Sequence, residues 1–355
     1  MEKSRQLWAD ILRILAIFCV ILIHSAAPLL TRYEEITIYA WWIGNLYNSI
    51  SRWCIPVFFM LSGTFLIQKA GTETPFRFYL KRLKRIFIPF VIWSGIYFLW
   101  RIYVNNENLN IALFFPLLIK EPVYYHLWFI YVLMELYLFA PVISSYIRSS
   151  NRNNQFYFLF LWFSIISVFP TLNHFYNTQT YFQSSMPSQL FVYSGYFILG
   201  YFIREISIER FVKKSLVLVF ISAFLITASG TWYLTVYKND GDFDQFFYEY
   251  FSFNVSLMAI SIFLIVKCSR LPQWIISFEN RHSFVGKVAR CVPGIYFLHA
   301  IVIAVFKRGF LGFSFDELTI SPSAGIPVFA TTVFLISLIL TTIIKTIPGV
   351  KHIVP

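Results

Sequence analysis

The feature that most constrains the fold of this chain is a series of about ten apolar stretches, most of them long enough to cross a lipid bilayer. A helix needs about 20 apolar residues to span the hydrocarbon core, and it satisfies its own backbone hydrogen bonds there. We therefore expect an all-α polytopic transmembrane helical bundle. Its spans are expected at residues 7–28, 43–67, 86–104, 126–146, 156–170, 188–203, 215–236, 247–266, 284–306 and 324–346.

Composition excludes the soluble classes of protein. Hydrophobic residues make up 58% of the 355 residues and charged residues 13%, whereas a soluble domain carries about 25% charged residues. No repeat, linker or soluble module interrupts the apolar stretches, so we expect one membrane domain over residues 1–355 and no fused soluble domain. The four cysteines stand singly, which favours neither a disulfide framework nor a metal site.

The distribution of basic residues indicates topology. Of the 29 Lys and Arg residues, 21 fall in segments on the same side as the N-terminus and 6 on the opposite side. Because Lys and Arg concentrate in cytoplasmic loops, we expect both termini in the cytoplasm of a multi-pass plasma (inner) membrane protein. The net charge of +12 is then a topology signal, and we expect no nucleic-acid partner.

The first span carries three ionisable residues, which are costly in a bilayer and are therefore functional candidates. Asp10 and Arg13 are three residues apart and can pair on one helix face. His24 follows Arg13 by eleven residues, which places it near the same face and roughly 16 Å further along the axis. A structural Asp–Arg pair with an interfacial histidine explains the pattern equally well. Both charged residues favour retention of this span over cleavage as a signal peptide.

Arg52 lies in the second span, shortly before Pro56, which frees a backbone carbonyl. An arginine at this depth should not face lipid. It either serves a site or forms a buried ion pair with Asp10 or Glu135 that orders the bundle. Glu135 is in turn either that partner or a proton-handling group, and the sequence leaves both interpretations open.

The segment before the third span contains Lys81, Arg82 and Arg85 among six basic residues, with Glu73 as the single acid. If this segment is helical, Arg82 and Arg85 are one turn apart and can grip two phosphates of one ligand. Basic clusters at cytoplasmic helix ends also bind anionic lipid head groups, and composition alone favours that interpretation.

Two further histidines lie in expected spans: His126 opens the fourth and His299 lies in the ninth. On the expected topology His24, His126 and His299 all fall in the outer half of the membrane, which suggests a polar cavity that opens outward. No nucleophile elbow, Walker, zinc-protease or dinucleotide-binding motif occurs in a usable context. Any chemistry must come from His, Arg and Asp side chains within the membrane.

Taken together, these segments resemble the acyltransferase-3 family of integral membrane O-acyltransferases, in particular the branch that contains the enterobacterial common antigen O-acetyltransferase. The matching pieces run over nearly the whole chain. They are Asp10-x-x-Arg13 with His24, the Arg52–Gly63 segment, Arg82-x-x-Arg85, the Tyr124–Phe129 segment, Gly195-x-x-x-x-Gly200, the Arg281–Ser283 segment and Ile295-Tyr296-x-x-His299.

The resemblance implies an acyl-CoA donor, commonly acetyl-CoA, used from the cytoplasmic side, and no permanently bound cofactor. The implied acceptor is a hydroxyl of a cell-envelope glycan or of its lipid-linked precursor. His24 matches the family's catalytic histidine and is expected to act as general base, and Arg82 and Arg85 match its Arg-x-x-Arg pair. The expected donor-binding residues are Lys81, Arg82 and Arg85, and the expected supporting catalytic residues are Asp10, Arg13, Arg52, His126 and His299.

Two other functions suit a bundle of this kind. A transporter or flippase for a glycan or lipid-linked sugar would also have buried ionisable residues, although no inverted repeat is visible. A sensory or scaffold protein explains none of the buried charges. Thioester turnover that depends on His24 would separate the enzyme from both alternatives.

Overall fold

The computed structural model describes residues 4–176 and 189–355, so Lys3 and residue 188, at the start of the sixth expected span, lie outside the described residues. The described residues form helices and no strand, as expected of an all-α fold. The elements are α1 (Ser4–Leu30), α2 (Ile38–Ser51), α3 (Cys54–Thr72), α4 (Pro75–Arg82), η1 (Leu83–Phe87), α5 (Ile88–Tyr103), η2 (Ile111–Leu113), α6 (Phe114–Lys120), α7 (Trp128–Ser149), α8 (Arg152–Phe163), η3 (Ser164–Val168), α9 (Phe169–Tyr176), α11 (Gln189–Ile203), α12 (Arg210–Tyr233), η4 (Leu234–Lys238), η5 (Phe246–Tyr248), α13 (Phe253–Lys267), α14 (Gln273–His282), α15 (Phe284–Lys307), α16 (Pro322–Thr346) and η6 (Lys351–Ile353).

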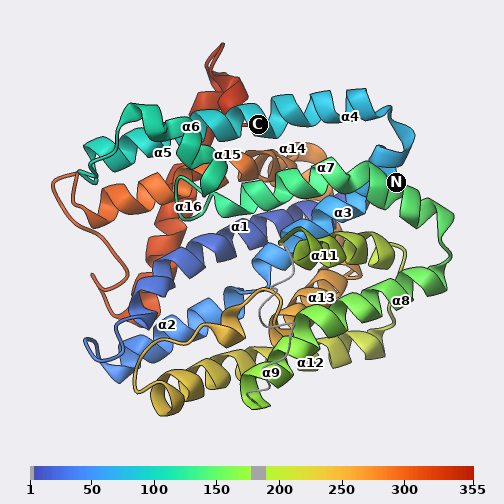
Figure 1. Cartoon of the computed structure of the whole chain (residues 1–355), viewed down its shortest axis with the longest axis horizontal. Helices are drawn as coiled ribbons and strands as arrows, with labels where there is room; N and C mark the ends of the chain where they lie inside the picture. Colours follow the sequence, from blue (N-terminus) through green and yellow to red (C-terminus); the bar gives the residue numbers. More distant parts are fainter. Residues whose placement is uncertain (1–3, 177–188) are drawn as a thin grey trace.

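Within the described ranges, nine helical segments are long and apolar enough to cross a membrane, which confirms the polytopic helical fold. The sixth expected span, residues 188–203, corresponds to α11, whose 15 described residues are fewer than those of the nine segments. Most helices run alongside one another (Figure 1). The start of α1 and the α3–α4 connection lie at one end of the bundle and the α1–α2 connection at the other. We call these the α3–α4 end and the α1–α2 end.

The second expected span is divided at Arg52 and Trp53, where α2 ends and α3 begins. Pro56 has no backbone N–H to donate to the carbonyl of Arg52, four residues earlier, so a regular helix would lose a hydrogen bond there. The proline at the start of α3 therefore accounts for the break. As a result, Arg52 lies at a turning point inside the bundle rather than on a continuous helix face.

The helices α3 and α11 approach closely because glycine stands at their crossing. A Cβ atom on Gly63 would lie 1.7 Å from the carbonyl oxygen of Phe197, and one on Gly200 would lie 1.9 Å from that of Met60. At the same crossing, the Thr64 hydroxyl donates a hydrogen bond of 2.9 Å to the carbonyl oxygen of Gly200. In lipid, helix association depends on such small residues and interhelical hydrogen bonds.

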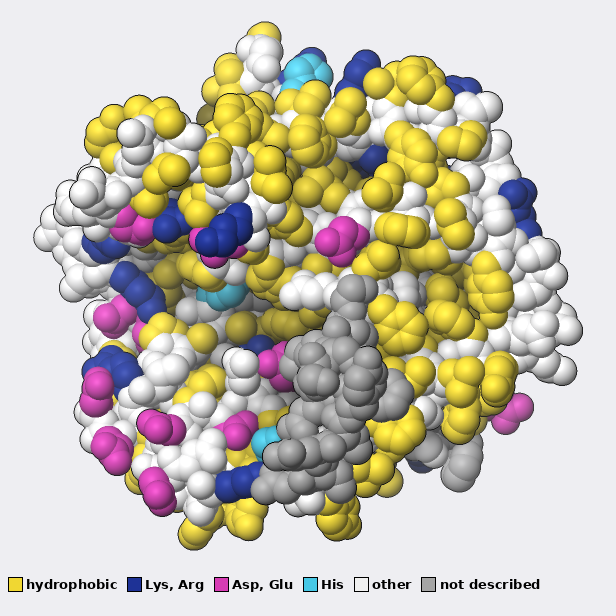
Figure 2. Space-filling model, viewed as in Figure 1, with side chains coloured by type: hydrophobic (Ala, Val, Ile, Leu, Met, Phe, Trp, Pro, Cys, Tyr) yellow, Lys and Arg dark blue, Asp and Glu magenta, His cyan; other side chains and the backbone are white. Residues whose placement is uncertain are grey.

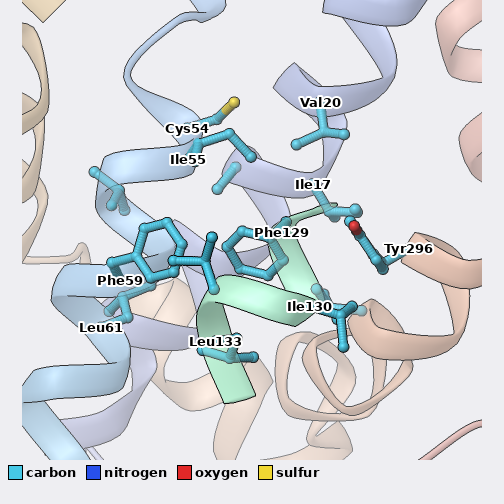
Figure 3. Packing of buried hydrophobic residues seen from close by; sticks show 14 of the residues in the cluster. Ile17, Val20, Cys54, Ile55, Phe59, Leu61, Phe129, Ile130, Leu133 and Tyr296 are labelled. Atoms are coloured by element: carbon cyan, nitrogen blue, oxygen red, sulfur yellow. The ribbon is translucent and has the colours of Figure 1, made fainter. Parts of the chain in front are cut away.

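The centre of the bundle joins α1, α3, α7 and α15. Figure 3 shows Ile17 and Val20 of α1, Phe59 of α3, Phe129 of α7 and Tyr296 of α15 around one apolar core. The rings of Phe59 and Phe129 lie 4.9 Å apart between centroids. Hydrophobic side chains also cover much of the face in Figure 2, as contact with acyl chains requires.

Candidate active site

Three histidine side chains from different parts of the chain meet in the half of the molecule toward the α1–α2 end. His24 comes from α1, His126 from the residues just before α7, and His299 from α15. The ring centroids of His24 and His299 lie 5.4 Å apart with the planes 25° from parallel, and those of His126 and His299 lie 5.0 Å apart. The three histidines that the sequence places at one depth thus lie together in the structure.

A small cavity of about 30 Å³ adjoins this cluster. A space of that size holds about one water molecule, so a substrate must widen it. His24 is partly exposed, whereas the side chains of His126 and His299 are buried, at 2% and 0% exposure. Figure 2 shows a hollow in the same half of the molecule, with a histidine at its floor. The cavity is lined by Val20, Ile23, His24, Ile55, His126, Trp128, Phe129, Tyr250 and Tyr296.

The hydrogen bonds fix which imidazole nitrogens are available. Nδ1 of His299 lies 2.6 Å from the carbonyl oxygen of Tyr296 and therefore donates to it, which leaves Nε2 as the nitrogen with a free lone pair. In the described part of the chain, Nε2 of His299 and both ring nitrogens of His126 are buried without a hydrogen-bond partner. Most buried polar atoms are paired, so these unpaired nitrogens are unusual. They are free to accept a hydrogen bond or a proton from a bound substrate, or to donate one to it.

Two tyrosines hold the histidines in place, and the sequence analysis did not single out either as a site residue. The Tyr296 hydroxyl donates a hydrogen bond to the backbone carbonyl of His126. The Tyr125 ring meets the His24 ring edge-on, with centroids 4.9 Å apart. Tyr296 precedes His299 by three residues and so shares its helix face, which is the signal that could have identified it. For Tyr125, the only such signal in the sequence is that it directly precedes His126.

Arg52 lies on a neighbouring aromatic and polar cluster. Its guanidinium carbon is 4.2 Å from the ring centroid of Tyr248 and 5.7 Å from that of Tyr250, which also lines the cavity. The Tyr248 hydroxyl donates a 2.5 Å hydrogen bond to Oδ1 of Asn45, which fixes the ring. The faces of the two rings therefore stabilise the arginine charge close to the cavity.

Of the two alternatives for Arg52, the buried ion pair with Asp10 or Glu135 is not found in the described part of the chain. Among the described residues, Asp10 pairs instead with Arg13, with 2.5 Å between Oδ1 and Nη1, and no ion pair joins Glu135 to Arg52. The Asp10–Arg13 pair lies near the α3–α4 end, because eleven residues of helix, about 16 Å, separate Arg13 from His24. The structure thus does not bring Asp10 or Arg13 to the histidines.

The basic residues of the α3–α4 segment divide into two groups. Glu73 accepts a 2.7 Å hydrogen bond from Nζ of Lys81 and lies 3.3 Å from Nη1 of Arg82, whose guanidinium also covers the ring of Phe78 at 3.9 Å. The hydrogen bond from Lys81, together with the charges of Lys81 and Arg82, lowers the pKa of Glu73 below its ordinary value of 4.5. Lys81 and Arg82 thus face a carboxylate of the chain itself.

Arg85 belongs to a different surface. It lies in the π-helical turn η1, whose hydrogen bonds skip one residue more than those of an α-helix, and it lines a cavity of about 500 Å³ with Lys84 and Lys345. The sequence predicted that Arg82 and Arg85 grip one ligand as neighbours one turn apart. In the structure only Arg85 faces the cavity, since the π-turn changes the helical spacing on which that prediction depended.

Comparison with known proteins decides between the function classes. Residues 6–344 match the family model described as an acyltransferase domain. The chain belongs to the acyltransferase-3 family. It is therefore a membrane-embedded acyltransferase that transfers groups other than aminoacyl groups, which the transporter and scaffold interpretations do not explain. No curated protein and no solved structure matches the chain.

Proposed function

We propose that the chain transfers an acyl group, with acetyl as the expected one, from acyl-CoA to a hydroxyl of a cell-envelope glycan or of its lipid-linked precursor. The reaction would take place at the plasma membrane. The observation that carries this proposal is the position of His24, which is partly exposed beside a cavity and next to two buried histidines. In an acyltransferase, such a histidine is suited to activate the acceptor hydroxyl.

In the proposed reaction, His24 is the general base. It accepts the proton of the acceptor hydroxyl while the oxygen attacks the thioester carbonyl carbon. The new C–O bond forms, the C–S bond breaks, and His24 returns the proton to the CoA sulfur. Imidazole, with a reference pKa near 6.5, exchanges protons near neutral pH, and a well-placed base contributes about 10²–10⁴-fold to the rate.

The oxyanion of the tetrahedral intermediate needs donors close to the cavity. Tyr250 lines the cavity and its ring lies beside the guanidinium of Arg52. We propose that the Tyr250 hydroxyl donates to the oxyanion and that Arg52 supports it with positive charge. His126, which also lines the cavity and is held by Tyr296, is the second candidate donor.

The donor's phosphates are proposed to bind on the α3–α4 side of the histidines, with Arg85 in direct contact, because this side chain faces a cavity rather than a carboxylate. Lys81 and Arg82 are held by Glu73 and are proposed to contribute only a weaker, longer-range attraction. The anionic end of the donor and the histidine cluster would then lie at different depths, with the thioester arm between them.

The test is to identify the product. Purified protein in nanodiscs is given acetyl-CoA labelled in the acetyl group together with an envelope glycan extract. We expect free CoA and a base-labile labelled ester on the glycan, and neither with His24→Ala. Label that stays in acetyl-CoA with every acceptor fraction would contradict the proposal. Omitting the acceptor separates direct transfer from a route through an acyl-histidine intermediate. Release of one CoA per protein molecule would indicate the intermediate, and no release would indicate direct transfer.

A further inference from the structure

A basic cavity lies between the π-turn η1 and the segment 347–355, on the α3–α4 side of the histidines. Figure 1 places the end of the chain beside the long helix formed by α4, η1 and α5. The cavity has a volume of about 500 Å³. We call this cavity the phosphate pocket. Its basic lining residues are Lys84, Arg85, Lys345, Lys351 and His352.

The 347–355 segment is fixed to the bundle rather than lying loosely on it. Nε1 of Trp93 in α5 donates a 2.8 Å hydrogen bond to the carbonyl oxygen of Ile353, and the side chain of Val354 is only 1% exposed in the apolar core. Nζ of Lys345 donates to the carbonyl oxygen of Arg290 at 2.6 Å. These contacts place the basic side chains around one cavity before any ligand binds, which lowers the entropy that binding must remove.

No Asp or Glu side chain offsets the charge of the phosphate pocket. Within residues 4–176 and 189–355, no Asp or Glu forms an ion pair with Lys84, Arg85, Lys345 or Lys351. Nζ of Lys345 also donates a 3.3 Å hydrogen bond to the backbone oxygen of Pro355, which lines the same cavity. The pocket lining also contains no Asp or Glu. Four ammonium or guanidinium groups and an imidazole around one space favour a ligand that carries several phosphate charges.

We infer that this pocket binds the phosphates of acyl-CoA, and that Lys345, Lys351 and His352 are donor-binding residues alongside Lys84 and Arg85. The inference rests on the proposed function for the choice of ligand. The diphosphate and the 3′-phosphate of CoA together carry about four negative charges, the monoester supplying between one and two of them. A phospholipid head group with a single phosphodiester would match only one of the four fixed positive charges.

The position of the pocket fits the length of the ligand. Twelve helical residues separate Arg85 from Tyr97, about 18 Å along the axis, and the Tyr97 ring lies 4.9 Å from that of His126. The pantetheine arm has about as many backbone bonds as four extended residues, and so reaches roughly 14 Å. Phosphates held in the pocket by long basic side chains therefore place the thioester near the histidines.

Three of the five basic pocket residues lie outside the family match. The match ends at residue 344, and Lys345, Lys351 and His352 follow it. Arg85, in contrast, lies within the match. The donor site thus combines a family segment with basic residues that the family match does not cover.

The experiment measures binding of CoA to the purified chain in nanodiscs of uncharged lipid. The test variants are Lys351→Ala/His352→Ala and Lys351→Arg, and the control is Arg77→Ala, an exposed basic residue of α4 outside the pocket. We expect the double variant to bind CoA about 10-fold or more weakly, consistent with loss of a charge-assisted contact. Lys351→Arg and Arg77→Ala should bind it like the unmodified chain.

Two results would overturn the inference. One is equal CoA affinity in the double variant and the unmodified chain, and the other is an equal loss in Arg77→Ala. A double variant that loses affinity for phosphatidylglycerol vesicles but not for CoA would assign the pocket to lipid instead. Failure of the proposed function is a different result: the unmodified chain binds CoA through the pocket but releases no CoA from acyl-CoA. If the unmodified chain releases CoA and the double variant binds CoA equally well, only the inference about the pocket is refuted.

Discussion

At the residue scale, one of the contacts that position the histidine cluster is the hydrogen bond from the Tyr296 hydroxyl to the backbone carbonyl of His126. We predict that Tyr296→Phe lowers the free energy of unfolding by about 1–3 kcal/mol, because a buried carbonyl loses its donor. It should also lower the turnover of acyl-CoA, since His126 is no longer held beside the cavity. Thermal unfolding in detergent and CoA release measure the two effects.

The matched control is Tyr103→Phe, which removes a hydroxyl from a tyrosine that is 70% exposed. This variant should behave like the unmodified chain in both assays. Equal unfolding temperatures and rates for Tyr296→Phe and the unmodified chain would show that the hydrogen bond does not position His126.

A second residue-scale prediction concerns pH. Because Lys81 and Arg82 lower the pKa of Glu73, the folded state binds a proton at this group less readily than the unfolded state. The stabilisation is complete above the ordinary pKa of 4.5 and is lost as the pH falls through the lowered value. We predict that the protection of the α3–α4 connection against hydrogen exchange, relative to the intrinsic rate at the same pH, falls below pH 4.5, and that Glu73→Gln lowers this protection at neutral pH. An exchange rate independent of this substitution would refute the role of Glu73.

At the scale of elements, the crossing of α3 and α11 should be the least tolerant contact in the bundle. We predict that Gly63→Val lowers the free energy of unfolding by about 3 kcal/mol or more, because its side chain would collide with the backbone at Phe197. Gly95→Ala is the control, since a Cβ there meets only Phe114, at 3.9 Å. Thermal unfolding in detergent checks both, and a Gly63→Val protein as stable as Gly95→Ala would contradict the packing.

One local feature could be predicted from residue type. Pro56 cannot donate a hydrogen bond to the carbonyl of Arg52, four residues earlier, and the structure breaks the helix between α2 and α3 at Arg52 and Trp53. The π-turn η1 could not be predicted in the same way, because no residue type in Leu83–Phe87 demands it. That turn, together with Glu73, separates Arg82 from Arg85, so a pattern based on regular helical spacing missed the division.

At the scale of the whole molecule, hydropathy predicted the class of fold, because a bilayer imposes the same length and apolarity on every spanning helix. The spans also placed His24, His126 and His299 at one depth, and in the structure their rings lie together. It did not predict which aromatic residues surround them, nor that the 347–355 segment returns to Trp93. Those contacts join residues far apart in the sequence, and no local pattern records them.

Topology gives the whole-molecule prediction. If the basic segments are cytoplasmic, Arg77→Cys in α4 should be labelled by an impermeant thiol reagent only from the cytoplasmic side of sealed vesicles. Ser314→Cys, in the exposed connection between α15 and α16, should be labelled only from the opposite side. The unmodified chain, with its four cysteines, gives the background. Labelling of both positions from one side would contradict the predicted orientation.

The measurement that tests the central claim most directly is acyl-CoA turnover by His24→Ala beside His282→Ala, which removes an exposed histidine of α14. Both variants are first shown to bind CoA and to unfold at the temperature of the unmodified chain. We predict that His24→Ala loses about 10²–10⁴-fold in CoA release and that His282→Ala loses none. Release by His24→Ala at the unmodified rate, or an equal loss in His282→Ala, would contradict the account.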